Sequence, residues 1–416
     1  MSGPQDKLIA TLDIGSSKVA CLIAEVGDNG NIHVLGVGNR ACPGMKKGAV
    51  VDPIAVERAV SAAMDQAEHM AGEKVDNVVA AISSGNPKSR IIEVTLSLDG
   101  HEISQADVNR ILTQARSELQ TEERRILHAF PAAYGLDDTF DVTPPIGLSG
   151  NILSVALHVI TMDDPPARNL EKVIERAHLN HTDLVSAAYA NGLAVLDDNE
   201  VRLGTTCIDI GGGTTEISMF AEQAMVHQMV LPFGGDQLTE LIARKLLTPY
   251  ENAEYLKTFG SAITTAADER SHIDVAHVGD ADVDEDVYVQ MPRSALTSIM
   301  QRWYEDLFTQ IQEHIEDSGF MGVAAHQFVL TGGAVECEGV VTLARRILGK
   351  RVRIGTPRSV QGLPEIALKP QFATAVGLLH YAVRAPKEAN KKVIRKVTEQ
   401  PTSLLGKLGS WFKSEF

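Results

Sequence analysis

A glycine-rich stretch at residues 208–216 combines the residue types that bind phosphate. It reads Ile-Asp-Ile-Gly-Gly-Gly-Thr-Thr-Glu, so an apolar strand runs into glycines, hydroxyls and a carboxylate. Glycine lets bare N–H groups approach a polyphosphate, and Asp209 at the strand end can hold Mg²⁺ through its water shell. The alternative is a glycine-rich hairpin turn without a ligand. The candidate phosphate-binding residues here are Gly211, Gly212, Gly213, Thr214 and Thr215.

The same pattern occurs near the N-terminus, where residues 12–19 read Leu-Asp-Ile-Gly-Ser-Ser-Lys-Val and Asp13 corresponds to Asp209. Each copy is followed by a second apolar stretch, so both loops are predicted to be tips of β-hairpins. Walker-type spacing is absent. The candidate phosphate-binding residues of this copy are Gly15, Ser16, Ser17 and Lys18. Lys18 points either toward the phosphates or along the hairpin into solvent, and the sequence leaves both orientations open.

A third glycine turn ends another apolar strand at residues 329–334, Val-Leu-Thr-Gly-Gly-Ala. Two hairpins with matching aspartates imply two duplicated α/β halves that face each other across one nucleotide. After the second hairpin, Gly234 and Gly235 open a helix whose free N–H groups would suit a phosphate or ribose. A capped helix without a ligand is the alternative.

The three turns together resemble the actin, sugar kinase and Hsp70 superfamily over about residues 7–385. Taken together with the C-terminal segment 403–416, in which Leu404, Leu405, Leu408, Trp411 and Phe412 are spaced as one face of a helix, the chain resembles the FtsA family of bacterial cell-division proteins. The resemblance implies an α/β, actin-like ATPase fold with two duplicated domains around a nucleotide cleft. ATP and Mg²⁺ would be its cofactors, with Mg²⁺ near Asp13 and Asp209. The adenosine would lie against Gly332 and Gly333.

The resemblance also suggests a catalytic position. Counting back from the glycine of the following helix, Asp183 falls where actin-like proteins carry a glutamine or glutamate that positions the attacking water. The shorter aspartate side chain implies weak or incidental ATPase activity. The alternative is that Thr182 or Asp183 is an ordinary N-cap of a helix that runs through Val195.

An inserted module is predicted between residues 89 and 161, where the pattern changes to a strand over 91–98, a helix capped by Ser104 and a strand over 153–161. By resemblance this small α+β module is subdomain 1C, the surface for other divisome proteins. The apolar segment 144–148 is either an interaction edge or a solvent-facing connector.

A second partner site follows from the same resemblance. The FtsZ C-terminal peptide would bind subdomain 2B, where a long helix is predicted over 292–320 and Arg293 and Arg302 supply cations. Exposed helix charges without a partner are the alternative. The acidic stretch 251–292 before it is predicted to be irregular and solvated.

Composition limits the remaining choices. With 416 residues the chain needs more than one domain, and 38 basic against 54 acidic residues give a net charge of −16, which argues against nucleic-acid binding. No apolar run approaches the ~18 residues of a spanning helix. The four cysteines show no metal-ligand spacing and are expected to be reduced thiols.

The C-terminal segment favours a membrane surface. A basic stretch over 387–396 reads as a flexible linker, and residues 403–416 then form an interfacial amphipathic helix. The alternative is a terminal helix packed on its own domain. The expected membrane-contacting residues are Leu404, Leu405, Leu408, Trp411 and Phe412.

This segment separates the competing classes, because a soluble metabolite kinase has no use for it and an Hsp70-like chaperone needs a substrate domain for which no residues remain. The favoured function is an ATP-binding, actin-like cell-division protein that forms filaments on the cytoplasmic face of the cell membrane at the septum, tethers the FtsZ ring and recruits later divisome proteins. A PilM-like scaffold of pilus assembly is the runner-up, followed by an actin-fold kinase.

The expected domains follow the superfamily order. They are 1–84 for the first part of 1A with phosphate loop one, 85–163 for the inserted 1C, 164–196 for the second part of 1A, 197–230 for the first part of 2A with phosphate loop two, 231–305 for 2B, 306–360 for the second part of 2A with the adenosine loop, 361–385 for the last helix of 1A, 386–402 for the basic linker and 403–416 for the amphipathic helix.

Overall fold

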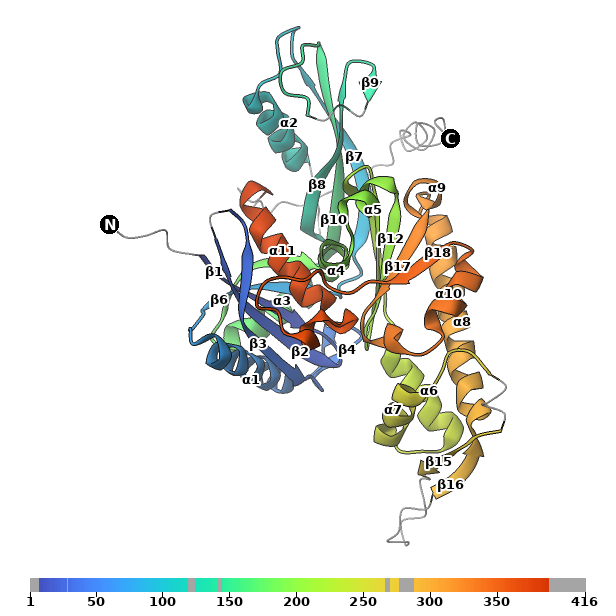
Figure 1. The fold of residues 1–416 in the computed structure, drawn as a ribbon. Coiled ribbons are helices and arrows are strands. Elements are labelled where there is room, and N and C mark those ends of the chain that lie inside the picture. The colour runs from blue at the N-terminus through green and yellow to red at the C-terminus, as the bar shows by residue number, and fades with distance from the viewer. Residues whose placement is uncertain are drawn as a thin grey trace.

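A computed structural model describes residues 7–27, 29–118, 124–140, 142, 144–265, 270–276 and 288–388 (Figure 1). The predicted amphipathic helix, the linker from residue 389 onward and the acidic cluster at 280–286 lie outside these residues. Within the described ranges, no helix is both long and apolar enough to cross a membrane.

The first half of the molecule is built on a five-stranded sheet with the order β11-β6-β1-β2-β3. Strands β1, β2 and β3 form an antiparallel meander, and β6 and β11 then run parallel to β1. The strands are β1 (Lys7–Ile14), β2 (Lys18–Val26), β3 (Ile32–Ala41), β6 (Asn77–Ile82) and β11 (Asn180–Ser186), with a small separate ladder of β4 (Met45–Lys46) and β5 (Ala49–Val50).

The second half repeats this arrangement in the order β14-β13-β12-β17-β18. Again a hairpin and a third antiparallel strand are followed by two parallel strands. The duplicated α/β halves expected from the repeated loops are confirmed. The strands are β12 (Thr205–Ile210), β13 (Thr215–Ala221), β14 (Ala224–Leu231), β17 (Gln327–Thr331) and β18 (Arg351–Ile354).

The inserted module is a separate sheet with the order β7-β10-β8-β9 and one helix, which project together from the rest of the molecule (Figure 1). Its elements are β7 (Lys88–Ser97), α2 (Gln105–Glu118), β8 (Arg124–Leu136), β9 (Thr139–Phe140) and β10 (Ile152–Asp163). The two predicted strands and the helix are confirmed. Strand β8 was not expected; Pro131 lies in it where its register with β10 shifts, and a proline in a strand obscures the pattern.

Helix α1 (Pro53–Ala71) begins after an aspartate and ends before a glycine, the residue types typical of helix caps. The Asp52 side chain accepts hydrogen bonds from the N–H groups of Ile54 and Ala55, and Gly72 closes the helix in the left-handed region. The other helices flanking the two sheets are α3 (Asp164–Arg176), α4 (Ala187–Val195), α5 (Asp198–Leu203), α9 (Met321–Ala324), α10 (Val340–Leu348) and α11 (Ala373–Glu388), with short 3-10 turns η1 (Gly333–Glu336), η2 (Glu365–Leu368) and η3 (Pro370–Phe372).

The predicted helix start at Thr182 or Asp183 is wrong. Both residues lie in strand β11, and the following helix α4 begins at Ala187 with Ser186 as its N-cap. Strand β11 pairs in parallel with β6 from Asn180 to Ser186. That pairing supplies the backbone hydrogen bonds, and it overrides the local capping signal.

The prediction of an irregular stretch over 251–292 is also wrong in part. It contains α7 (Tyr250–Phe259) and a ladder of β15 (His272–Ala276) with β16 (Tyr288–Pro292). Together with α6 (Gly235–Leu246) and α8 (Arg293–Asp317) these elements form a lobe at the opposite end of the molecule from the insert (Figure 1). The long helix predicted over 292–320 is confirmed as α8.

Helices α4 and α11 form the centre of the molecule. Every residue of α4 is buried, and one apolar cluster joins Leu193 of α4 and Val376 of α11 to Phe220 and Val329 of the second sheet. The helices cross closely, because a Cβ added at Gly377 of α11 would lie 1.8 Å from the carbonyl oxygen of Ala190. Only glycine fits this contact without a backbone shift.

We therefore expect Gly377→Ala to separate α4 from α11 and to destabilise the protein by about 1 to 3 kcal/mol or more, as overpacked cores do. Gly322→Ala in α9 is the matched control, since a Cβ there meets no atom within 4 Å. Thermal unfolding followed by circular dichroism should show a lower midpoint for Gly377→Ala alone. Equal midpoints for the two variants would contradict this close contact.

Candidate functional site

The two predicted phosphate loops have the same geometry. In each, the N–H of the first glycine donates to the carbonyl three residues on: Gly15 to Lys18 and Gly211 to Thr214, both at 2.9 Å. Both loops are tips of antiparallel hairpins, as predicted. Asp13 and Asp209 lie one residue before the end of their strands, so the two carboxylates occupy equivalent positions in the two halves.

The two loops also touch each other. A Cβ at Gly213 would lie 2.3 Å from Oγ of Ser16, and Ser16 Oγ accepts a hydrogen bond of 3.1 Å from the N–H of Gly48. A Cβ at Gly212 would lie 3.2 Å from Cβ of Ser17. The backbone of the second loop therefore lies against the side chains of the first, and a side chain at Gly213 would overlap Ser16 and the backbone N of Lys47.

The third turn lies over the second aspartate. Gly332 has a φ of +90°, and a Cβ on it would lie 2.1 Å from Oδ1 of Asp209. Its N–H donates to the carbonyl of Pro370 at 3.3 Å, and Gly333 begins the 3-10 turn η1 beside it. The structure thus brings all three glycine turns together, although they are far apart in sequence.

The N-terminus of α6 does not offer the expected free N–H groups. The N–H of Gly235 donates to the carbonyl of Gly211 at 2.9 Å, and that of Asp236 to Gly212 at 2.8 Å. A Cβ at Gly234 would lie 2.5 Å from the Gly211 oxygen. Gly234 and Gly235 therefore hold the second loop in place from behind, which corrects the prediction of free donors.

Lys18 takes the inward orientation. Its Nζ lies 3.6 Å from the centre of the Phe372 ring, is buried, and forms no hydrogen bond with the described residues. Burial lowers the pKa of Lys18 to about 8, and the charges of Asp13, Asp209 and Glu336 partly offset that effect. A buried ammonium without hydrogen bonds has unfilled capacity for an anion.

Asp13 and Asp209 lie near this cation, and Glu216 lies near both of these carboxyl groups. Burial raises the pKa of Asp13 to about 6, partly offset by Lys18. Burial and repulsion from Glu216 and Asp13 raise the pKa of Asp209, whereas the Asn191 side chain opposes this rise. Burial also raises the pKa of Glu216 to about 7, against a hydrogen bond of 2.6 Å from Thr214 Oγ1.

Several members of this cluster were not predicted from the sequence. Glu216 belongs to the second loop motif, but the sequence pattern assigns it no role. Asn191 of α4 accepts a hydrogen bond of 2.8 Å from Thr374 Oγ1, and Phe372 lies against Lys18. No spacing rule connects these positions to the loops, because they reach the site only through the packing of α4 and of the segment before α11.

Asp183 does not join the loops. It pairs with Val79 of β6, and Val79 pairs with Thr11 of β1, two residues before Asp13. Asp183 therefore lies two strands away from Asp13 and below the level of the loop tips, at about 4.8 Å per strand. This position gives no support to the predicted water-positioning role.

Arg293 and Arg302 occupy different faces of α8. They are nine residues apart, which corresponds to about 13 Å along the axis and half a turn around it. The Arg293 guanidinium donates to the carbonyl of Phe259 at 3.0 Å, whereas Arg302 is exposed. The two arginines cannot line one groove on a single helix face.

Comparison with known proteins identifies the family. The model "Cell division protein FtsA" matches residues 206–377, and the model "SHS2 domain inserted in FTSA" matches residues 84–161. The cell division protein FtsA of Rhizobium meliloti is 38% identical, and the match covers 98% of this chain and 95% of that protein. The chain belongs to the FtsA family.

Other relatives agree with this assignment. FtsA of Escherichia coli K12 is 33% identical, with 99% of this chain and 98% of that protein covered. Cell division is thus favoured over the kinase and pilus-assembly alternatives. The structure of a PilM-PilN type IV pilus biogenesis complex has a TM-score of 0.63 at 16% identity, covering 91% of this chain and 99% of that one. MreB5 of Spiroplasma citri bound to ADP scores 0.56 at 12% identity, covering 92% and 99%. These two structures confirm the actin-like fold.

The buried carboxylates predict a pH-dependent stability. Because the pKa of Asp13 is raised from 3.8 to about 6, the folded protein holds this proton more tightly than the unfolded chain. The free energy of unfolding therefore decreases as the pH rises from about 4 through about 6, because the folded protein favours the neutral form of Asp13. We expect Asp13→Asn to stabilise the ligand-free protein at pH 8 by on the order of 1 to 3 kcal/mol, and to have little effect near pH 4.

The measurement is the thermal unfolding midpoint of both proteins between pH 4 and pH 8, without nucleotide or divalent cations. The variant should gain a few degrees over the wild type only at the upper end. A difference independent of pH would show that Asp13 titrates at its ordinary value.

Proposed function

We propose that ATP with Mg²⁺ binds between the two halves, where the three glycine turns meet. The β- and γ-phosphates would contact the first loop at Gly15, Ser16 and Ser17 and the second loop from Gly211 to Thr215. The adenosine would lie against Gly332 and Gly333. The observation that carries this proposal is Lys18, whose buried Nζ has no hydrogen bond with the described residues and lies where the loops converge.

The carboxylates suit a divalent cation. Asp13, Asp209 and Glu216 are buried near one another with Lys18 as the nearby cation, so a bound positive charge would relieve their repulsion. Mg²⁺ keeps several of its waters in protein sites, which agrees with contact to Asp13 and Asp209 through water. Since Asp183 lies away from the loops, we propose that hydrolysis is weak or incidental.

ATP binding is expected to fail in Gly212→Asp. A Cβ at this position would lie 3.0 Å from Oδ1 of Asp236 and 3.2 Å from Ser17, so the new carboxylate would crowd both loops and repel the phosphates. Isothermal titration should show affinity at least about tenfold weaker. Gly322→Asp, which adds the same charge in open space, is the control. Unchanged affinity in folded Gly212→Asp protein would remove the second loop from the site.

At the level of the cell, we propose a peripheral membrane protein on the cytoplasmic face of the cell membrane at the septum. It would assemble into actin-like filaments and tether FtsZ. The support for the membrane contact is the sequence of residues 403–416, whose large apolar side chains contribute on the order of 1.5 to 3 kcal/mol each when buried. Filament formation would multiply the weak binding of single helices by avidity.

The FtsZ C-terminal peptide is proposed to bind the lobe that contains α7 and α8. Tyr255 and Phe259 on α7 are 60% and 61% exposed, and their ring centres lie 4.6 Å apart. Arg293 contacts the Phe259 carbonyl beside them. An exposed aromatic pair next to a cation suits a peptide with apolar and acidic residues, so Arg293 rather than Arg302 is proposed for this groove.

Other divisome proteins are proposed to bind the inserted module. Its segment 144–148 exposes Ile146 and Leu148, each 44% accessible. The segment is held on the module by backbone hydrogen bonds from Gly147 to Ile103 and from Ile103 to Leu148, at 2.9 and 2.8 Å. Apolar side chains on a fixed segment favour an interaction edge over a plain connector.

One sedimentation experiment tests the tether. A labelled FtsZ C-terminal peptide is mixed with the protein and anionic liposomes. Wild type should carry the peptide into the pellet, and truncation after Thr402 should leave both in solution. Arg293→Glu should sediment without the peptide, while Arg302→Glu, the control on the opposite face of α8, should retain it.

The outcomes separate the parts of the proposal. Truncated protein that sediments as well as the full chain would show that the last helix does not bind the membrane. Equal peptide recovery with Arg293→Glu and wild type would place the peptide elsewhere.

A further inference from the structure

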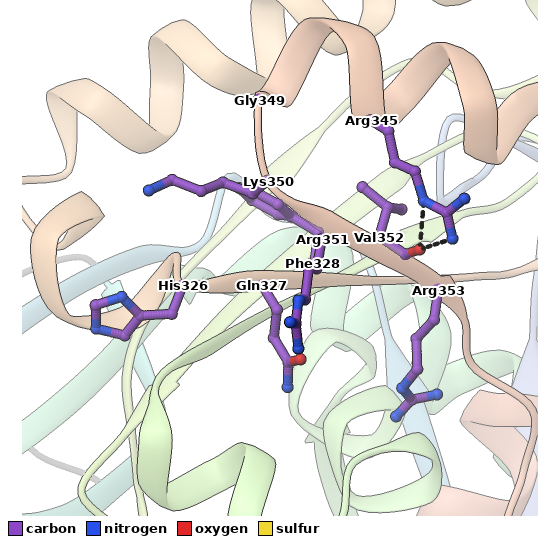
Figure 2. Close-up of a pocket in the computed structure, with 9 residues that line it drawn as sticks. All are labelled: His326, Gln327, Phe328, Arg345, Gly349, Lys350, Arg351, Val352 and Arg353. Atoms are coloured by element: carbon purple, nitrogen blue, oxygen red, sulfur yellow. Dashed lines mark hydrogen bonds between the residues drawn. The ribbon is translucent and has the colours of Figure 1, made fainter.

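A positively charged pocket lies on the second half, away from the three glycine turns. It has a volume of about 730 Å³ and is formed by the end of α10, the turn after it and strands β17 and β18 (Figure 2). Arg345, Lys350, Arg351 and Arg353 line it together with His326, and the lining contains no carboxylate. In a chain with a net charge of −16 this grouping of cations is unusual.

The pocket borders the open edge of a sheet, since β18 is the last strand in its order. The N–H of Gly355 donates to Leu330 of β17 at 2.7 Å, so the alternate residues Val352 and Ile354 turn their backbone groups away from β17. Their carbonyls are already bonded: Arg345 donates twice to Val352, at 3.1 and 2.7 Å, and Arg353 donates to Ile354 at 3.1 Å.

This arrangement selects against another strand. A strand that joins a sheet edge needs both N–H donors and carbonyl acceptors, and here guanidinium groups cover the acceptors. What remains on this edge is a row of donors and positive charge. Such a surface suits an anion with several oxygen atoms rather than a β-strand.

The charge of the pocket is largely uncompensated. Arg353 is the exception, because its guanidinium forms hydrogen bonds of 2.7 and 2.5 Å with Glu200. Among the residues the structure describes, no ion pair is formed by Arg345, Lys350 or Arg351. Figure 2 shows the Lys350 side chain extending away from Arg345, while Arg351 points toward Gln327.

We propose that this pocket binds a soluble, phosphate-bearing small molecule through Arg345, Lys350 and Arg351. Its volume lies within the range of about 300 to 1,000 Å³ that is usual for small-molecule sites. The guanidinium of Arg345 is held in place by its two hydrogen bonds to the Val352 carbonyl. Lys350 and Arg351 are exposed and supply the other two cations. The pocket contains Gln327 and Phe328 at the start of β17, whereas Gly332 follows the other end of this strand, so the pocket is separate from the proposed nucleotide site.

The test titrates inorganic tripolyphosphate into the full chain by isothermal titration calorimetry, after saturation of the cleft with a non-hydrolysable ATP analogue. Lys350→Glu/Arg351→Glu should weaken binding about tenfold or more, since two attractive charges become repulsive. Arg244→Glu/Lys245→Glu is the matched control, because these adjacent residues on α6 are also exposed and undergo the same charge change. Its affinity should equal that of the wild type.

Absence of binding to the wild type at millimolar tripolyphosphate, or an equal loss in both double variants, would overturn the proposal. Two further probes distinguish other sources of anionic groups. Phosphatidylglycerol vesicles or hexaglutamate that bind through Lys350 and Arg351, while tripolyphosphate does not, would assign the pocket to a lipid headgroup or an acidic peptide and overturn the soluble ligand. The two double variants can be compared whether or not nucleotide binds between the halves. Failure of this proposal can therefore be told apart from failure of the proposed ATP site.

Discussion

The contact between α4 and α11 sets the geometry on which the rest of the molecule depends. Gly377 and Ala190 bring the two backbones so close that the helices have one relative position. From that position α4 packs on the second half: Gly192 contacts the ring of Phe220 in β13, and Val195 lies against Gly355, the residue after β18. The distance between the two halves, and hence between the two phosphate loops, follows from this packing rather than from the loops themselves.

The inserted module is anchored to the same helix. Its His128 accepts a hydrogen bond of 2.9 Å from the N–H of Ser186 at the start of α4, and burial lowers the pKa of His128 to about 3, so the ring is a neutral acceptor. Ser186 Oγ donates to Gln228 of the second half at 2.5 Å. Insert, first half and second half therefore meet at one end of α4, while Asn191 lies further along it beside Asp209. A shift of α4 would therefore change the packing of the insert and of both halves.

The charged residues of the two proposed sites differ in how much burial costs them. Asp209 and the Lys18 Nζ atom are buried and Asp13 is half-buried, and the pKa values of all three groups move toward the neutral forms because desolvation outweighs their mutual attraction. Lys350 and Arg351 are exposed and keep their charge at little cost. Lys18, Asp13 and Asp209 gain much from a ligand that neutralises them. Lys350 and Arg351 can release a ligand readily, because water solvates their exposed charges once the ligand has left.

The sequence by itself determined the three glycine turns, the two strand-end aspartates, the duplication and the family. These features are local: each is a short pattern of glycines and an apolar run, with an aspartate near the strand end in two of the three turns, and it can be recognised from a few neighbouring residues. The start of α1 at Asp52 was predictable for the same reason, since a cap acts on the next few N–H groups.

Only the tertiary structure decided the rest. The direction of Lys18 depends on Phe372, more than 350 residues away in the chain. Pairing with β6 made Asp183 a strand residue, and the carbonyls of Gly211 and Gly212 occupied the N–H groups of α6 that were expected to be free. In the basic pocket, Arg345 of α10 donates to the carbonyl of Val352 in β18. This carbonyl is accessible because β18 is the last strand of its sheet. For Lys18, Asp183 and the N-terminus of α6, the deciding partner is a backbone group or ring distant in sequence, so local residue patterns carry no record of it.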